Sequence, residues 1–403
     1  MALQRSQPAP STVHTALATA AASVLVRRPR LFGALERPGD VFGHLGPNWF
    51  ASVMGTGIVA NAAALLPVDI PGLRGFAVAV WLLAATMLVL LTAATAIHWL
   101  RYPEHARRHH HDPAMAPFYG APPMALLTVG AGALLVGRDI VGLGAGVRID
   151  EILWALGTIT GLLSTIAIPY LAFTEYQLKR EDMYATWLLP VVPPMVSAAT
   201  GAALIAHLPP GQPRLALLLA CYAMFGISLF VALITITLLW GRLAFYGVGP
   251  ARLAPTLWIV LGPLGQSITA AGLLSNAAPS AISTPYTATL HATDVVYGVP
   301  VWGFAMVWLA IAAAITLRTA REHLPFSLTW WSFTFPVGTV VTGTSVLALA
   351  THAIFLRDAS VALYALLIAA WLTAATQTTR GALSGRLFLP PPTAAPVAAH
   401  TAG

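Results

Sequence analysis

The chain has few charged side chains and a single cysteine. Lys, Arg, Asp and Glu make up 9% of its 403 residues, hydrophobic residues make up 57%, and the mean hydropathy is +0.75. So few charges cannot cover a soluble surface, and the apolar runs are too many for one core, so we expect a polytopic membrane protein. Cys221 stands without a partner, which excludes an internal disulfide and a cysteine metal cluster, and we interpret it as a small core residue.

The apolar runs are sufficient for ten membrane-spanning helices, because a hydrocarbon core of about 30 Å needs about 20 apolar residues per helix. We expect residues 1–45 to be a poorly ordered, basic cytoplasmic arm, residues 46–380 the transmembrane domain and residues 381–403 a disordered cytoplasmic tail. The predicted spans lie near residues 46–66, 75–100, 118–137, 151–174, 184–207, 214–240, 254–275, 291–317, 327–353 and 360–379.

The basic residues gather on one side of this topology. With the N-terminus inside, 16 of the 21 Lys and Arg residues fall in cytoplasmic segments. The positive-inside rule then places both termini in the cytoplasm. The net charge of +7 is therefore interpreted as a topology signal and not as a nucleic-acid surface.

An aromatic residue precedes a helix-breaking Pro or Gly by five or six residues at five places. The aromatics are 69, 69, 71 and 72 residues apart, which indicates five copies of a unit with two spans each. The pairs are Trp49/Gly55, Phe118/Pro123, Trp187/Pro193, Trp258/Pro263 and Trp330/Pro336.

Odd-numbered and even-numbered spans differ in composition. The odd ones concentrate Pro, Gly, Ser, Thr and Gln, whereas the even ones are more uniformly aliphatic. Irregular backbone at membrane depth survives only where it is packed in protein or lines a wet cavity. We therefore expect an all-α fold with an inner ring of five kinked helices around a central pore and an outer ring of five helices facing lipid. Prolines that only help a compact bundle to pack are the alternative.

No ionisable side chain is predicted at the centre of an odd-numbered span, which disfavours a pump with a fixed carboxylate at mid-membrane. Helix dipoles, backbone donors and hydroxyls would instead stabilise an anion without trapping it. Gln266 either bonds a neighbouring helix or offers its amide to a solute. The predicted path-lining residues are Thr56, Gly57, Pro123, Pro193, Ser197, Pro263, Gln266, Ser267 and Thr339.

Ionisable residues do flank the spans. The loop at residues 101–113 holds four histidines, which we interpret as a solvated charge run and not as a metal site. His291 and Asp294 open the eighth span and are candidates for proton exchange at the rim of the pore. The alternative is that an acid such as malate crosses as a monoanion. We predict no metal and no cofactor.

Four motifs resemble the tellurite-resistance/dicarboxylate transporter family, which includes malate permeases, sulfite exporters and plant slow anion channels. They are PNWFASVMGTGIVA at 47–60, WLLPVVPPMVSA at 187–198, GPLGQS at 262–267 and WWSFTFPVGT at 330–339, and the resemblance extends over residues 43–380. It implies a ten-helix fold of five hairpins around a central pore, commonly in a homotrimer, with a phenylalanine on the ninth helix that occludes the pore. That phenylalanine corresponds to Phe335, which as a lone aromatic in a bundle would otherwise be a packing residue.

We therefore predict a permease of the cell membrane for small anions, with C4-dicarboxylates such as malate as its cargo, and not an enzyme. A channel or exporter for inorganic anions such as sulfite, chloride or nitrate is the alternative. An intramembrane haem enzyme is disfavoured, because most of the 12 histidines lie in loops or at helix ends.

Overall fold

The computed structural model describes residues 31–35 and 37–389, and within these ranges the chain is helical and has no β-strand. Eight helical stretches of the described chain are long and apolar enough to cross a membrane. The prediction of an all-helical, polytopic membrane protein is therefore confirmed. The stretches are Leu73–Arg101, Ala116–Val141, Leu143–Thr174, Gln212–Tyr246, Ala251–Ser280, Pro285–Arg321, Leu328–Thr351 and Ile354–Ser384.

Two of the predicted spans correspond to shorter helices. These are α2 (Phe50–Leu65) and α8 (Pro193–Ile205), which follow the 3-10 segments η2 (Pro47–Trp49) and η6 (Ala185–Leu188). Nearly every residue of both helices is buried in the protein. Because protein and not lipid surrounds them, neither helix needs a long apolar run of its own.

Five helices form the interior of the bundle. α2 contacts α5 and α12, α8 contacts α5 and α10, and α10 contacts α12, so the contacts close a circuit. The 3-10 segments that precede these helices contact one another in the same order, so all five helices begin at the same end of the bundle. The remaining members are α5 (Ala121–Gly132), α10 (Leu261–Ala277) and α12 (Phe335–Thr351), which follow η3 (Ala116–Gly120), η7 (Ala251–Val260) and η9 (Leu328–Phe333).

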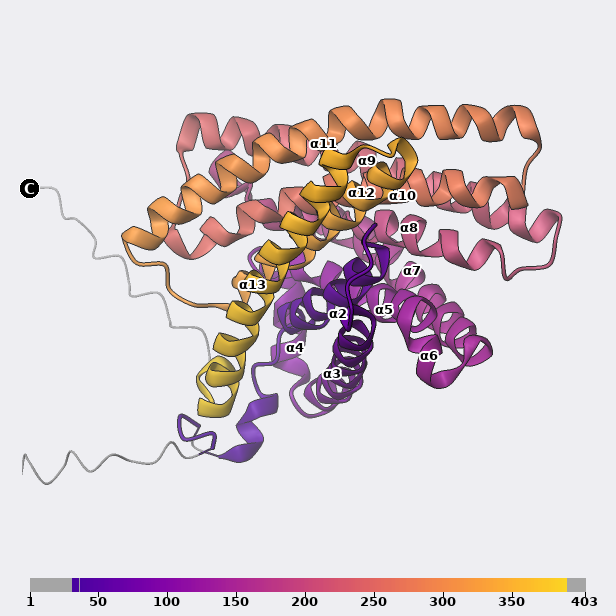
Figure 1. Cartoon of the computed structure of the whole chain (residues 1–403). Coiled ribbons are helices and arrows are strands. Elements are labelled where there is room, and N and C mark those ends of the chain that lie inside the picture. The colour runs from indigo at the N-terminus through magenta and orange to yellow at the C-terminus, as the bar shows by residue number, and fades with distance from the viewer. Residues whose placement is uncertain (1–30, 36, 390–403) are drawn as a thin grey trace, which may run out of the picture.

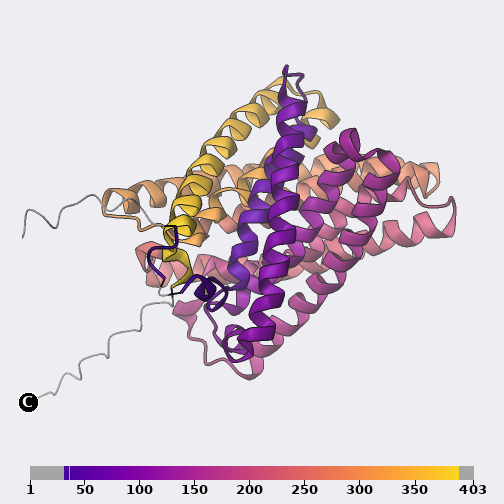
Figure 2. The same cartoon turned by 90° about the horizontal axis from the view of Figure 1, so that it is seen from below.

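Five long helices cover the outside, each packed on the inner helix that precedes it in the chain (Figures 1 and 2). In the most apolar part of each outer helix at most 28% of the residues are buried, against at least 67% in the three inner stretches that are long enough to span. The inner helices are thus packed in protein and the outer ones are left for lipid. The outer helices are α3 (Leu73–Arg101), α7 (Leu143–Thr174), α9 (Gln212–Tyr246), α11 (Thr284–Arg321) and α13 (Ile354–Ser384).

The repeated prolines lie at the starts of inner helices and not at kinks within them. Pro193 and Pro336 occupy the first two positions of α8 and α12, and Pro123 and Pro263 the third positions of α5 and α10. Proline lacks an N–H and has a fixed φ, so the first turn of a helix accepts it where the interior does not. The expected kinks are therefore replaced by a change from 3-10 to α-helix.

Both ends of the described chain pack together. The backbone N–H of Phe32 donates to the carbonyl of Leu383, and the Phe388 ring lies 4.9 Å from that of Trp49. η1 (Pro38–Phe42) contacts α3 and η10 (Arg386–Phe388) and so belongs to the packed structure. α13 and η10 continue past the predicted end of the transmembrane domain at residue 380. The rest of the predicted arm and tail lies outside the described residues.

Candidate functional site

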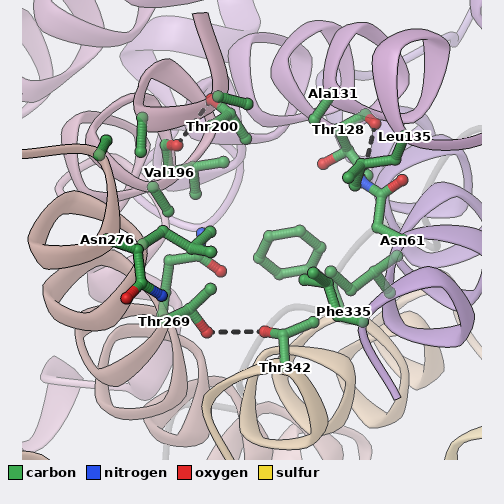
Figure 3. Close-up of a pocket in the computed structure, with 18 of the residues that line it drawn as sticks. Asn61, Thr128, Ala131, Leu135, Val196, Thr200, Thr269, Asn276, Phe335 and Thr342 are labelled. Carbon is green, nitrogen blue, oxygen red and sulfur yellow. Dashed lines mark hydrogen bonds between the residues drawn. The ribbon is translucent and has the colours of Figure 1, made fainter. Parts of the chain in front are cut away.

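A cavity of about 310 Å³ lies among the five inner helices, and each of them contributes to its wall (Figure 3). The side chains of the wall are all neutral. Its polar members are the carboxamides of Asn61, Gln266 and Asn276 and the hydroxyls of Thr128, Thr200, Thr269 and Thr342. Such a wall offers hydrogen-bond donors and acceptors without a fixed charge.

The wall repeats along the sequence with the same period as the aromatic residues. On four of the helices the lining residues follow the spacing i, i+3, i+7, and on α12 they follow i, i+7. Equivalent positions in successive helices are 68 to 70 residues apart. The first positions are Ile58, Thr128, Val196, Gln266 and Phe335, and the last are Leu65, Leu135, Ala203, Leu273 and Thr342. Phe335 and Gln266 are therefore equivalent positions of neighbouring repeats.

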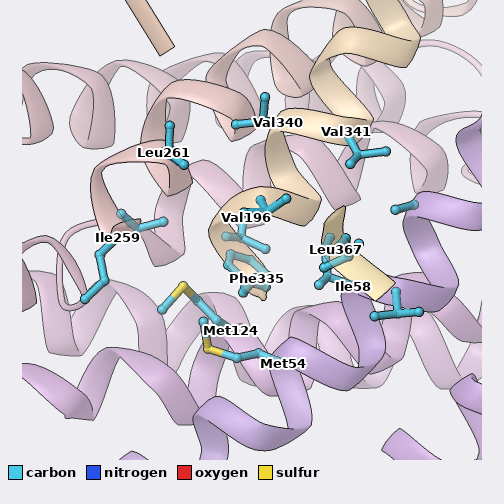
Figure 4. Packing of buried hydrophobic residues seen from close by; sticks show 14 of the residues in the cluster. Met54, Ile58, Met124, Val196, Ile259, Leu261, Phe335, Val340, Val341 and Leu367 are labelled. Carbon is cyan, nitrogen blue, oxygen red and sulfur yellow. The ribbon is translucent and has the colours of Figure 1, made fainter. Parts of the chain in front are cut away.

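Phe335 closes the cavity at the end where the inner helices begin. Its side chain is 2% exposed and lines both the large cavity and a second one of about 10 Å³. Met54 and Met124 line the small cavity and lie beside the ring in Figure 4. The ring thus separates the large cavity from the starts of the helices.

The opposite end of the cavity is open. Ala203, Ala206 and Asn276 belong to its wall and are exposed at the surface of the protein. These residues lie at the C-terminal ends of α8 and α10. The cavity is therefore a funnel with its mouth at one end of the bundle and Phe335 at its base.

The polar groups of the wall differ in how they are paired. Asn61 Nδ2 donates to the carbonyl of Thr128 at 3.0 Å, and the hydroxyls of Thr269 and Thr342 bond each other at 2.7 Å. The Gln266 carboxamide makes no hydrogen bond with any described residue, although the side chain is only 4% exposed. Because an unpaired buried carboxamide costs free energy, a solute or water that bonds Gln266 is stabilised there.

The predicted gate Phe335 and the predicted path residue Gln266 both line the cavity. The other polar residues of the predicted path lie where helices contact one another. Thr56 accepts a hydrogen bond from Trp371 Nε1 of α13 at 3.2 Å. Ser197 accepts one from Thr158 of α7 at 3.0 Å, and Thr339 donates to a carbonyl of α10 at 3.2 Å.

The glycine and prolines of the prediction also pack against other helices. A Cβ on Gly57 would lie 2.8 Å from Thr128, and Pro123 and Pro193 lie beside Gly161 of α7. Pro263 belongs, with Ser267, to the wall of a separate apolar cavity between α8, α9, α10 and α11. None of these positions lines the central cavity, and a role for them elsewhere on the path stays a prediction.

Six polar residues of the wall were absent from the predicted set. They are Asn61, Thr128, Thr200, Thr269, Asn276 and Thr342. Most lie one or two helical turns beyond the predicted positions. Most of them could have been identified by taking the positions i, i+3 and i+7 on one inner helix and adding the repeat period of about 70 residues to reach the next.

The candidate proton-exchange pair lies away from the cavity. His291 is exposed, and Asp294 is 4% exposed and lies against Gly272 where α11 packs on α10. Neither residue lines the central cavity. Proton exchange through this pair stays a prediction.

The histidines near residues 101–113 pack on the segment before α2. His105 Nδ1 lies 3.0 Å from the carbonyl oxygen of Gly43, and its ring stacks on that of His44 at 5.1 Å. The ring of His109 stacks on that of His98 at 5.4 Å, and burial lowers the pKa of His109 to about 4. No group of His, Cys, Asp and Glu in the described ranges has the arrangement of a metal site.

Comparison with known proteins identifies the family. The sequence profile of the SLAC1 family, described as voltage-dependent anion channel, matches residues 44–379. An uncharacterized transporter of Methanocaldococcus jannaschii is 26% identical over 88% of this chain and 98% of its own length. A sulfite efflux pump of Trichophyton rubrum is 29% identical over 74% of this chain and 80% of its own length. A Schizosaccharomyces pombe protein named "Putative malic acid transport protein" is 22% identical over 77% of this chain and 72% of its own length. The chain belongs to the SLAC1 family of anion channels and transporters, the tellurite-resistance/dicarboxylate transporter family that its motifs resemble.

Proposed function

We propose that this protein is a permease of the cell membrane that moves small anions through the central cavity. The observation that carries the proposal is the neutral cavity among the inner helices, lined by amides and hydroxyls and closed at one end by Phe335. In this proposal the chain crosses the membrane ten times, as five hairpins in a quasi-five-fold arrangement, with both termini in the cytoplasm. The helix starts and Phe335 then face the cytoplasm, and the mouth of the funnel faces outward.

The closed end of the cavity suits an anion because of the direction of the inner helices. Their N-termini, each equivalent to roughly +0.5 of a charge, begin at the end that Phe335 closes. Deeper in, the N–H groups of the Gln266 carboxamide, which makes no hydrogen bond with a described residue, can donate to an anion. The threonine hydroxyls of the wall donate to helix carbonyls and can turn to an anion by rotating away from them. Conduction requires binding that is strong enough for an anion to enter and weak enough for it to leave, and dipoles meet that requirement better than a buried arginine.

The Phe335 ring acts as the gate in this proposal. It separates the large cavity from the small one, so an anion that passes between them must displace it. A change of rotamer into the large cavity would open the connection without moving a helix. Flux therefore depends on how often the ring leaves its packed position.

Malate is the predicted cargo, and sulfite is the second candidate. The observation in favour of sulfite is that relatives named as sulfite efflux pumps reach 28% and 29% identity, whereas the relative named for malic acid reaches 22%. Both are small oxyanions with several acceptor oxygens, which the threonine hydroxyls and the Gln266 amide can bond. We also propose a homotrimer with one pathway in each protomer.

The test is uptake of radiolabelled malate and sulfite into proteoliposomes that hold the wild-type protein or the variant Gln266→Leu. We expect one of the two anions to enter faster than into empty liposomes. The variant should take up that anion at least about tenfold more slowly, because a hydrogen bond to a charged group contributes about 1.5–3 kcal/mol. Ser267→Ala is the matched control, since Ser267 does not line the cavity. Uptake of neither anion by folded wild-type protein would contradict the proposal. The mass of the detergent complex measured by light scattering tests the trimer.

A further inference from the structure

A second hollow lies outside the central cavity, where the outer helices α9 and α11 meet over α10. It has a volume of about 150 Å³, and its wall combines aromatic, aliphatic and acidic side chains. The wall consists of Tyr222, Phe225, Leu229, Ala271, Leu290, Thr293, Asp294 and Tyr297. None of these residues lines the central cavity, so this hollow is a separate feature.

Asp294 supplies a carboxylate without a partner to this hollow. The side chain is 4% exposed and forms no hydrogen bond or ion pair with any described residue. His291, one turn away, is exposed and forms no hydrogen bond or ion pair with Asp294, although it lies close enough for its charge to act on the carboxylate. A Cβ on Gly272 of α10 would lie 2.1 Å from Val346 Cγ1 of α12 and 3.1 Å from Asp294 Oδ2, so the carboxylate packs closely on α10 beside this glycine. A buried carboxylate is costly unless a cation or a proton neutralises it.

The aromatic rings around Asp294 favour a cation over an anion. Tyr222, Phe225 and Tyr297 all line the hollow, and the rings of Phe225 and Tyr297 meet edge to face at 5.7 Å. Aromatic faces attract ammonium groups, most strongly where water is excluded. The carboxylate repels anions, so this hollow cannot serve the cargo of the central cavity.

An apolar groove continues from the hollow along the same seam. A neighbouring cavity of about 110 Å³ shares Leu229 and Tyr297 with it and extends to Ile236 and Val301. The distance from Leu290 to Val301 is about 16 Å at 1.5 Å per residue of helix. Leu233 in the groove wall is 47% exposed, so the groove reaches the lipid-facing surface of the outer helices. Its shape and polarity suit an alkyl chain.

We propose that this seam binds a membrane amphiphile with an ammonium head group and an alkyl chain. The ammonium group lies between the Asp294 carboxylate and the aromatic rings, and the chain follows the groove past Leu229 toward Ile236. The site opens to the bilayer and is independent of the anion pathway.

Binding of radiolabelled decyltrimethylammonium to the protein in nanodiscs tests the proposal, with binding to empty nanodiscs subtracted. We expect saturable binding to the wild type, at least about tenfold weaker binding to Asp294→Asn, and no saturable binding of decyl sulfate. Asp69→Asn is the matched control, because Asp69 is an exposed acid in another part of the chain, and it should bind like the wild type. Equal affinity of Asp294→Asn and the wild type would overturn the proposal, since the carboxyl group would then be neutral.

A second variant tests the groove without changing the carboxylate. Leu229→Trp fills the space that the two cavities share, so we expect it to abolish decyltrimethylammonium binding while anion flux stays at the wild-type rate. If Asp294→Asn fails to fold, the Leu229→Trp variant alone tests whether the seam binds the amphiphile. Unchanged binding to Leu229→Trp, or saturable binding of decyl sulfate to the wild type, would show adsorption to the apolar surface only and would refute the site.

Discussion

Replacing Phe335 with alanine should raise anion flux through this protein. The ring is 2% exposed and forms the boundary between the large cavity and the small one at the starts of the inner helices. In the wild type the ring must leave this packed position before an anion can pass. In the alanine variant the boundary is absent and the two cavities join.

The size of the effect follows from the burial of the ring. Burying a Phe side chain contributes about 1.5–3 kcal/mol, so displacing the ring costs a similar amount. At 1.4 kcal/mol for each factor of ten, the displaced state is disfavoured by about 10- to 150-fold, and removal of the ring should raise flux by that factor. The same substitution leaves a cavity in the core and should lower the free energy of unfolding by about 3–5 kcal/mol.

The assay is anion current and radiolabelled uptake in proteoliposomes with equal amounts of protein. Phe333→Ala is the matched control, because Phe333 packs on Trp258 at 5.2 Å and on Trp330 at 5.9 Å and lines neither cavity. It should lose stability without gaining flux. If folded Phe335→Ala protein conducts no faster than Phe333→Ala, the ring is a packing residue and the gate is refuted.

Three further predictions concern packing, pH and coupling. Gly265→Ala should lower the free energy of unfolding by about 1–3 kcal/mol in a thermal unfolding assay, because the added Cβ would lie 2.4 Å from the backbone of α12. Gly262→Ala is the control and should resemble the wild type, because its Cβ would meet no atom of another element within 4 Å. The pKa of His109 is about 4 in the folded protein and near 6.5 in the unfolded chain, so the unfolded chain takes up a proton first as the pH falls. The stability of the protein should therefore fall as the pH drops from 6.5 to 4. The variant His109→Gln should show a weaker dependence of the apparent Tm on pH over this range. If His291 and Asp294 exchange a proton as predicted, replacing both should abolish the response of uptake to a pH gradient while binding of the anion is kept. A response that persists in the double variant would refute the pair, which does not line the central cavity.

The division into buried and lipid-facing helices could be predicted because the two kinds of helix differ in amino-acid composition. Helices surrounded by protein tolerate Gly, Pro and Thr at close contacts, whereas helices in lipid need aliphatic surfaces. Gly265 is an example, since it lies directly against the backbone of α12. α2 and α8 were placed by the same reasoning, although neither is long enough by itself to identify as a span.

The position of the prolines could not be predicted in the same way. A 3-10 segment followed by an α-helix and a continuous helix with a kink have the same hydropathy and the same proline spacing. Pro193 and Pro336 fit either reading, and only the backbone shows that they begin α8 and α12.

The side chains that line the cavity could be predicted only in part, because the sequence does not fix which way each inner helix is turned. Successive residues of an α-helix point about 100° apart, so an error in the helical phase moves a side chain from the cavity to a helix contact. Gln266 lies on the cavity side of α10, whereas its neighbour Ser267 faces α9 and α11. Thr342 lies seven residues after Phe335 on the same face, which the motif around Phe335 did not reveal.

Anions cross the protein through the central cavity in this proposal, and chemical modification of one wall residue tests that path most directly. In Thr342→Cys a negatively charged methanethiosulfonate reagent would attach within the funnel, and the only native cysteine, Cys221, is buried and should not react. We predict that modification lowers anion flux by more than about tenfold, because a fixed negative charge repels the cargo in a site of low dielectric constant. Ser280→Cys, exposed after α10, should be modified without loss of flux. Complete modification of Thr342→Cys with unchanged flux would contradict the account.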